Sequence, residues 1–351
     1  MKIWKIESKS MFYNDILCVK EDELPNFLIN NAKEEYYGEP REIPKKGGKR
    51  KIYCIETSNK LYEIQKNICT NFLSNIMLPD VVYGFRKETN YIEFLMPHIN
   101  FYGNSYYLRL DIKNFFGSIN KKTIRKTLKY YFKANDNFTN KDIKLLLDRV
   151  YEILTYNNKV IQGAPSSPIL SNIIFRRLDI RIQKYCRCFQ INYTRYADDM
   201  LFSSDNVSVF KDSFVSGITN IISSEGFNIN YGKTIRSKNK ISLGGYVISD
   251  NIRLSRNKLS DLSRVLFYVE NNKDYKKDSY YNELNAFIIK QTGSESLKFG
   301  GIYSLINYFA GNRAFIISIL KYSQDKNFCN KAEKIIRRLE KIILRLYNNI
   351  G

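Results

Sequence analysis

Tyr196-Ala197-Asp198-Asp199-Met200-Leu201-Phe202 places two adjacent aspartates between residues that favour β-strands. Because the whole segment 191–202 is rich in such residues, we predict a hairpin with both acids at its turn. Neighbouring carboxylates repel each other unless a cation compensates their charge. A solvated Asp-Asp turn is the ordinary alternative, but the strand-forming flanks favour a turn that is held by a sheet.

A third acid ends another predicted strand. The segment 106–112 has strand character and carries Asp111 near its end. Three carboxylates on neighbouring strands can hold two Mg²⁺ ions about 3.5–4 Å apart, and magnesium prefers hard oxygen ligands and substrate phosphates. Such ions support in-line attack of a 3′-hydroxyl on an α-phosphorus, with pyrophosphate as the leaving group. Contact between Asp111 and Asp198 is an inference, because the two residues lie far apart in the sequence.

The composition favours a polyanionic partner. The 351 residues include 56 Lys and Arg against 35 Asp and Glu, which gives a net charge of +21. This excess makes nucleic acid the expected partner, ahead of an anionic membrane surface. A compositional bias toward Lys would raise the acidic residues as well, so it explains the net charge poorly.

The remaining residue types exclude several kinds of site. The single histidine, His98, excludes multi-histidine metal sites. Among six scattered cysteines only Cys186 and Cys188 are close, and they lack a second pair that would complete a zinc site. We expect free thiols in a reducing compartment. No apolar segment reaches ~18 residues and no signal peptide is recognised, so we predict a cytoplasmic protein without a membrane span.

Helices and strands are predicted to alternate up to about residue 250 and to give way to helices beyond it. Apolar residues at helical spacing predict helices over 61–72 and from Asn140 to Leu154, with Asn140 as the cap. Residues 241–248 are predicted as a strand pair with two glycines inside. The polar segment 271–282 is the best candidate for a linker.

Six ordered segments resemble the motifs of the reverse transcriptase family. Tyr196-Ala197-Asp198-Asp199 resembles its Y-x-D-D motif, and the segment 110–119 resembles the first catalytic motif of bacterial members. The other four are Gln162-Gly163-Ala164-Pro165-Ser166-Ser167-Pro168 with Ser171-Asn172, Gly226-Phe227-Asn228-Ile229-Asn230 with Lys233, Leu243-Gly244-Gly245-Tyr246, and Gly48-Lys49-Arg50-Lys51-Ile52 with Leu61 and Gln65. Their order and spacing make the resemblance specific.

The resemblance implies an α+β protein with a right-hand polymerase fold. It would consist of fingers, a palm whose antiparallel sheet carries the Y-x-D-D hairpin, and a helical thumb. We expect the N-terminal segment and fingers in residues 1–105. The palm would occupy 106–250, with a fingers insertion around 120–160, and the helical thumb and C-terminal helix would occupy 251–351.

The resemblance also assigns the chemistry. Asp111, Asp198 and Asp199 would bind two Mg²⁺ ions, or Mn²⁺ in their place, together with Ile112. Lys233 is either the proton donor to pyrophosphate or an ordinary surface lysine.

A further set would bind the nucleotide and the primer. Lys49 and Arg50 would contact the triphosphate, since a guanidinium binds phosphate oxygens bidentately, although a solvated basic turn is the alternative. Phe116 would be the steric gate that selects deoxynucleotides, and we expect one of Phe115 and Phe116 to be a core residue. Gln162 and Gly163 would line the nucleotide pocket, and a turn that caps the next helix is the alternative. Gly245 and Tyr246 would support the primer end, and a β-bulge is the alternative.

Two basic helix faces are candidates for RNA binding, with a solvated face as the alternative for each. Such faces can follow a phosphate backbone. The first holds Lys121, Lys122, Arg125 and Lys126, and the second holds Lys334, Arg337, Arg338 and Lys341. His98 is a candidate RNA contact through a partial match to N-A-x-x-H, or else a residue of local packing.

The implied function is RNA-directed DNA synthesis from deoxynucleoside triphosphates. The order of the motifs is most similar to that of retron-like and other defence-associated enzymes. We therefore expect a cognate structured non-coding RNA as template, a DNA product and a role in anti-phage defence. An effector protein and an oligomer are possible partners. Ile55 stands where proline is usual, and Leu243-Gly244-Gly245 stands where V-T-G is usual. Template-independent or protein-primed synthesis and a group II intron-like enzyme remain alternatives. A non-catalytic RNA-binding scaffold fits less well, because it would not need the three acids.

Overall fold

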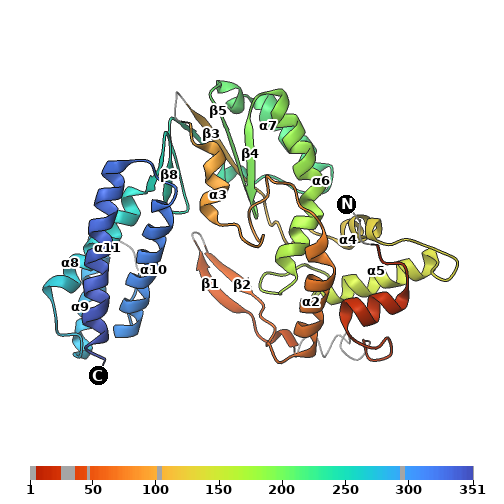
Figure 1. The fold of residues 1–351 in the computed structure, drawn as a ribbon, viewed down its shortest axis with the longest axis horizontal. Helices are drawn as coiled ribbons and strands as arrows, with labels where there is room; N and C mark the ends of the chain where they lie inside the picture. Colours follow the sequence, from red (N-terminus) through yellow and green to blue (C-terminus); the bar gives the residue numbers. More distant parts are fainter. Residues whose placement is uncertain (1–4, 25–35, 46–47, 101–104, 293–296, 351) are drawn as a thin grey trace. The chain divides into compact units, whose positions relative to one another are not determined.

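The computed structural model describes residues 5–24, 36–45, 48–100, 105–292 and 297–350. Helices and antiparallel strands make up these residues (Figure 1). The chain divides into two compact units, the first comprising 1–97 and 108–236 and the second comprising 98–107 and 237–351. The division passes through two strands, between residues 107 and 108 and between residues 236 and 237.

The first unit is built around a four-stranded sheet with the order β4-β5-β3-β6. Its strands are β3 (Tyr106–Asp111), β4 (Asn192–Tyr196), β5 (Asp199–Ser204) and β6 (Ile235–Lys238), and a separate hairpin pairs β1 (Arg41–Lys45) with β2 (Gly48–Ile52). Its α-helices are α2 (Lys60–Asn71), α3 (Tyr91–Leu95), α4 (Lys121–Leu128), α5 (Asn140–Leu154), α6 (Ser167–Cys188) and α7 (Asp212–Ser223). Short helical turns complete the unit: η1 (Met11–Leu17), η3 (Leu73–Asn75), η5 (Lys129–Tyr131), η6 (Val207–Phe210) and η7 (Tyr231–Lys233). A further turn, η4 (Met96–His98), is divided between the two units after Pro97.

The helix α5 has the predicted extent but a different cap. Thr139, not Asn140, is the N-cap residue. The Thr139 hydroxyl accepts from the Asp142 amide at 3.3 Å, and the Asp142 carboxylate accepts from the Thr139 amide at 2.9 Å. This reciprocal capping box satisfies two amides at the start of the helix, which explains why the helix begins at Asn140.

The second unit joins a small antiparallel sheet to four helices. The sheet has the order β7-β8-β9, with β7 (Ile241–Leu243), β8 (Tyr246–Ile248) and β9 (Ile252–Leu254). The helices are α8 (Arg256–Asn271), α9 (Asp278–Thr292), α10 (Ile302–Leu320) and α11 (Lys326–Tyr347). Only 272–277 of the predicted linker 271–282 lies between helices, because α9 already begins at Asp278.

The two glycines inside the β7–β8 pair form a tight turn. Leu243 pairs with Tyr246, so Gly244 and Gly245 are the only residues between the strands. Their φ angles are 58° and 88°, and a two-residue hairpin turn with positive φ at both positions favours glycine. The segment is therefore a hairpin turn, not the β-bulge considered as an alternative.

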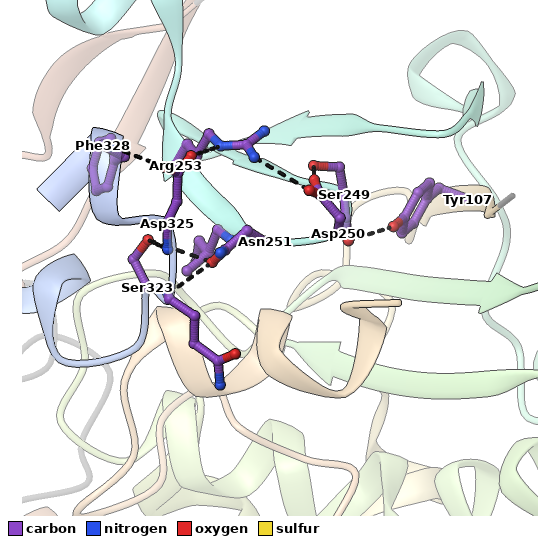
Figure 2. A network of polar contacts seen from close by, with 10 residues as sticks. Tyr107, Ser249, Asp250, Asn251, Arg253, Ser323, Asp325 and Phe328 are labelled. Carbon is purple, nitrogen blue, oxygen red and sulfur yellow. Dashed lines mark hydrogen bonds and ion pairs between the residues drawn. The ribbon is translucent and has the colours of Figure 1, made fainter. Parts of the chain in front are cut away.

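A polar network ties the small sheet to the start of α11 (Figure 2). Arg253 of β9 donates to Asp325, the N-cap residue of α11, at 2.7 Å and to Asp250 at 3.3 Å. The side-chain oxygen of Asn251, which is buried, accepts from the Gln324 amide at 3.2 Å. These contacts explain why the β7–β9 segment belongs to the second unit.

The boundaries of the two compact units differ from the predicted domain ranges 1–105, 106–250 and 251–351. The division into fingers, palm and thumb at those ranges stays a prediction.

The single histidine is a buried residue of the second unit. His98 has 1% of its surface exposed, and burial lowers the pKa of its imidazole to about 3. The side chain is therefore neutral at physiological pH, which fits the alternative of local packing.

We expect this histidine to make the protein acid-sensitive. In the unfolded chain the imidazole binds a proton near pH 6.5, whereas in the folded protein it does so only near pH 3. The free energy of unfolding should therefore fall by about 1.4 kcal/mol per pH unit as the pH drops below 6.5. Urea unfolding at a series of pH values measures this slope, and His98→Gln should reduce it by about that amount. An NMR titration midpoint near 6.5 for the folded protein's only imidazole would contradict the expectation.

Candidate active site

The predicted acidic hairpin is confirmed. Strands β4 and β5 pair antiparallel with Tyr196 opposite Asp199, so Ala197 and Asp198 form a two-residue turn. Ala197 has a φ of 55°, a left-handed conformation that a residue with a Cβ adopts only when its surroundings impose it. Asp198 thus lies at the tip of the turn and Asp199 begins β5.

The inferred contact between the two acidic segments is also confirmed. Strand β3 lies between β5 and β6 in the sheet. The Ile112 amide donates to the Asp198 carbonyl at 2.9 Å, and the Asn230 amide donates to the Asp111 carbonyl at 2.8 Å. The main chain therefore holds Asp111, Asp198 and the segment before Lys233 side by side.

A cluster of charges surrounds the first two acids. The Asp111 carboxylate is almost fully buried and lies 2.9 Å from the Lys233 ammonium. Burial raises the pKa of Asp198, and the negative charge of Asp111 raises it further, while Lys233 and Arg50 oppose the shift. Two carboxylates thus share one partly dehydrated site with two cations close by.

Asp199 has a different partner. The Arg109 guanidinium donates to its carboxylate, with the Nε at 2.9 Å. Burial raises the pKa of Asp199 and Arg109 lowers it. In the part of the chain that the structure describes, no group of three or more His, Cys, Asp or Glu side chains is arranged to hold a metal ion.

The donors that are present still fit a divalent ion. Asp111 and Asp198 supply hard carboxylate oxygens and Ile112 lines the same cavity. Arg109 was not predicted as a site residue, although it lies two residues before Asp111 on a strand and such residues point to the same face.

A cavity of about 510 Å³ opens at these acids. Its walls come from β2, from the segments after β3 and before α6, and from η7, and the described residues that line it are all in the first unit. It brings together eight of the predicted site residues: Asp111, Ile112, Asp198, Lys233, Lys49, Arg50, Phe116 and Gln162. Asp199 and Gly163 are not among its lining residues, and Gly245 and Tyr246 belong to the second unit.

The two phenylalanines after Asp111 have different environments. Phe115 is 3% exposed, and its ring centroid lies 5.7 Å from that of Phe175 and 5.9 Å from that of Phe227. Both side chains border the cavity, but Phe116 is only half-buried, and its ring centroid lies 6.2 Å from that of Phe85. Phe115 is therefore the expected core residue of the pair, and Phe116 is the one available to a ligand.

Gly163 is required by the protein's own main chain. Its φ is 108°, and a Cβ at this position would lie 2.2 Å from the Tyr53 carbonyl oxygen. The Tyr53 amide also donates to the Gln162 carbonyl at 2.9 Å. Glycine thus permits the segment after β2 to approach residues 162–163, which places Gln162 in the cavity wall.

A fully buried ion pair supports the acidic hairpin. Arg195 of β4 and Asp179 of α6 are both 0% exposed, and their two hydrogen bonds measure 2.8 and 2.7 Å. The remaining guanidinium nitrogen donates to the Asn172 side chain at 3.1 Å and to the Ala197 carbonyl at 2.9 Å. This arginine therefore holds the strained residue that precedes Asp198.

The same network reaches the loop before α3. The side-chain amide nitrogen of Asn172 donates to the Gly84 carbonyl oxygen at 2.7 Å. A Cβ on Gly84 would lie 2.4 Å from the Ala197 amide nitrogen. The loop can pass this close to the hairpin only because residue 84 is glycine, and no pattern in the sequence had indicated the network.

The residues predicted at the primer end lie around the turn of the small sheet. Tyr246 is buried, with its ring centroid 4.6 Å from that of Phe315 in α10. A Cβ on Gly245 would lie 3.3 Å from the same ring. These contacts explain the glycine and the tyrosine by packing within the second unit, and their role at a primer stays a prediction.

The basic residues predicted to bind RNA differ in how far their charge is compensated. In α4, Lys121 and Arg125 both pair with Asp148, and Lys126 pairs with Glu225 at 2.7 Å. In α11, Arg338 pairs with Glu270 at 2.6 Å. The other four, Lys122, Lys334, Arg337 and Lys341, are exposed. Contact of any of these residues with RNA stays a prediction.

The comparison with known proteins identifies the family. Residues 43–248 match the family model of the reverse transcriptase (RNA-dependent DNA polymerase). The chain belongs to this family. The α+β polymerase fold and the enzyme class, an RNA-directed DNA polymerase, are therefore confirmed.

Three retron reverse transcriptases are among the relatives. The Ec86 enzyme of Escherichia coli is 31% identical over 236 residues, which cover 65% of this chain and 68% of the relative. The Ec73 enzyme of Escherichia coli is 32% identical over 46% of this chain and 51% of its own length, and the Mx65 enzyme of Myxococcus xanthus is 26% identical over 64% and 54%. The chain is thus a retron-like member of the family that spans about half to two thirds of the length of these relatives.

Among the described residues, no helix has the length and apolarity needed to span a bilayer.

Proposed function

We propose that this reverse transcriptase copies a cognate structured non-coding RNA into DNA. The observation that carries the proposal is the cavity in which Asp111 and Asp198 meet Arg50 and Lys233. Paired carboxylates bind divalent cations, and the surrounding basic side chains suit a triphosphate. The likeness to retron enzymes supports a dedicated RNA as template.

The proposed metal ions are two Mg²⁺, for which Mn²⁺ could substitute. Asp111, Asp198 and the main chain at Ile112 are the donors best placed for them, and Asp199 would contribute after separating from Arg109 or would act through that ion pair. When bound, such ions activate the attacking 3′-hydroxyl and stabilise the charge on the leaving pyrophosphate.

The protein's own residues would orient the nucleotide. Lys49 and Arg50 at the end of the β1–β2 hairpin would bind phosphate oxygens, and Gln162 would border the base or sugar. Lys233, whose side chain is 53% exposed and whose ammonium faces Asp111, is positioned to donate a proton to pyrophosphate. Phe116 would lie beneath the sugar and exclude a 2′-hydroxyl.

Phe116→Ala is expected to relax the choice of sugar. Removing the ring opens space beside the cavity, so the preference for deoxynucleotides should fall by roughly tenfold to 200-fold. Single-nucleotide incorporation with each deoxynucleotide and its ribonucleotide measures the ratio of kcat/KM. Phe227→Leu is the matched control, because that ring is fully buried and is not among the lining residues of the cavity, and it should lower stability while leaving the ratio unchanged. Unaltered sugar selectivity in Phe116→Ala would remove this residue from the gate role.

Primer extension on a defined RNA template tests the proposed activity. With Mg²⁺ and all four deoxynucleotides, we expect DNA complementary to the template, and Asp111→Asn should abolish it. Products without template complementarity would favour template-independent synthesis instead. DNA linked covalently to the protein would favour protein priming.

The biological setting forms part of the proposal. We propose that the protein acts in anti-phage defence in the cytoplasm, together with an effector protein. The proposal holds for a monomer and for an oligomer. The six cysteines are free thiols, which suits a reducing compartment. Sequencing the RNA and DNA that co-purify with the protein would identify the template, the primer and the product together. A group II intron-like role would instead yield intron RNA.

A further inference from the structure

The outer face of α6 carries a concentration of positive charge that the sequence analysis did not single out. The buried residues of this helix are mainly apolar and pack against the unit's core, with β4 and α7 among its neighbours. Its cations, Arg176, Arg177, Arg181, Lys184 and Arg187, are exposed or half-buried. Arg177, Arg181 and Lys184 follow the i, i+4, i+7 spacing of a single helix face.

Neutral groups hold three of these arginines in place. The Arg176 Nε donates to the Met77 carbonyl at 2.7 Å, and the Arg181 Nη1 donates to the Ser224 hydroxyl at 2.7 Å. The Arg177 guanidinium lies 4.4 Å from the ring centroid of Tyr130, a ring that also faces the Lys5 ammonium at 6.0 Å. The side chains are thus oriented while their charges remain uncompensated.

Elsewhere in the described residues, arginines commonly pair with carboxylates. Those that do are Arg109, Arg125, Arg149, Arg195, Arg236, Arg253, Arg264, Arg313 and Arg338. For the five cations of α6, no ion pair is found within the described ranges.

The acids close to this helix are already engaged. Glu225, which follows Ser224, pairs with Lys126 at 2.7 Å. Asp179 of α6 is buried against Arg195. The charge of the α6 face is therefore available to an external anion.

We propose that this face of α6, with the neighbouring Tyr130, binds the phosphate backbone of RNA outside the catalytic cavity. The inference rests on the proposed function, because it adds a second contact surface for the same RNA. Planar guanidinium groups fixed in advance match phosphate oxygens bidentately, and the 62% exposed ring of Tyr130 offers a stacking surface for an unpaired base. The first of the five cations lies nine residues into α6, so the surface starts about 14 Å along the helix from its N-terminus near the cavity.

The test is the salt dependence of RNA binding by a charge-neutralised variant. The variant combines Arg177→Gln, Arg181→Gln and Lys184→Gln, and its control combines Lys66→Gln, Lys141→Gln and Lys144→Gln, exposed lysines of the same unit. The probe is a synthetic RNA hairpin, with a DNA hairpin of the same sequence beside it, in fluorescence anisotropy over a series of KCl concentrations. Loss of three phosphate contacts should reduce the slope of log K against log salt by about two and weaken RNA binding by on the order of tenfold to a hundredfold. The control should keep the wild-type slope.

Extension of a short primer–template separates this inference from the proposed function. We expect the triple variant to extend it at the wild-type rate, because none of its three residues lines the cavity. Absence of extension in the wild type would overturn the proposed polymerase activity and leave the slope measurement interpretable. A wild-type slope with the RNA hairpin, or a loss seen only with the DNA hairpin or with anionic lipid vesicles, would overturn the assignment of this face to RNA. If the triple variant unfolds, the double variant Arg181→Gln, Lys184→Gln, which alters exposed side chains only, should show about two thirds of the change in slope.

Discussion

Asp198→Asn is expected to reduce nucleotide incorporation by on the order of a thousandfold or more, because the loss of a charge that would hold the proposed metal ions removes several kcal/mol of transition-state stabilisation. Asparagine keeps the size of the side chain at the tip of the β4–β5 turn. The buried repulsion with Asp111, which raises the pKa of Asp198, disappears in the variant. The free energy of unfolding should therefore stay unchanged or increase while activity is lost.

Single-turnover incorporation and urea unfolding of the same preparations measure the two effects. Asp212→Asn is the control, because that acid begins α7 with 99% of its side chain exposed and forms a 3.6 Å ion pair with Arg236; it should leave activity unchanged and lower stability at most slightly. Residual synthesis close to the wild-type rate in Asp198→Asn would remove this residue from the metal site. Asp199→Asn distinguishes direct metal binding by Asp199 from a role through its ion pair with Arg109. If the carboxylate acts mainly through Arg109, the loss of activity should be smaller than in Asp198→Asn.

Arg195→Met is expected to lower the free energy of unfolding by about 3–5 kcal/mol, since it leaves Asp179 as an uncompensated buried charge. Asp179 would then retain only the 2.8 Å bond from the Tyr193 hydroxyl. Activity should fall as well, because the Ala197 carbonyl loses its donor next to Asp198. Arg264→Met is the control, since its pair with Asp261 is exposed and should contribute no more than about 1 kcal/mol.

A double variant separates stability from positioning. Arg195→Met combined with Asp179→Leu removes both charges, and packed apolar side chains often replace a buried ion pair with little net cost. We therefore expect the double variant to regain most of the stability that Arg195→Met loses, whereas DNA synthesis stays low because Ala197 remains unsupported. If activity recovers in parallel with stability, the ion pair is purely structural. Circular dichroism in urea and primer extension on the same samples provide the comparison.

The sequence by itself indicated which residues are expected to carry the chemistry, and it determined the local structures that present them. Strand-forming residues on both sides of Asp198-Asp199 predicted the hairpin, because β-branched and aromatic residues that flank a short polar turn favour two paired strands. The helix after Asn140 followed from its apolar spacing, and the expectation that one of two phenylalanines would be core followed from their adjacency. Order and spacing of short motifs were enough to indicate the family.

Only the tertiary structure decided how charges are partnered. Arg109 with Asp199, Arg195 with Asp179, and the α4 cations with Asp148 and Glu225 are pairs between separate elements. For the same reason, the sequence could not show which basic helix faces lack acidic partners. Within the described residues, the face of α6 is one of them. The physical reason is that local propensities depend on near neighbours in the chain, whereas ion pairing depends on burial and on distances that exist only once the sheet and its helices have packed.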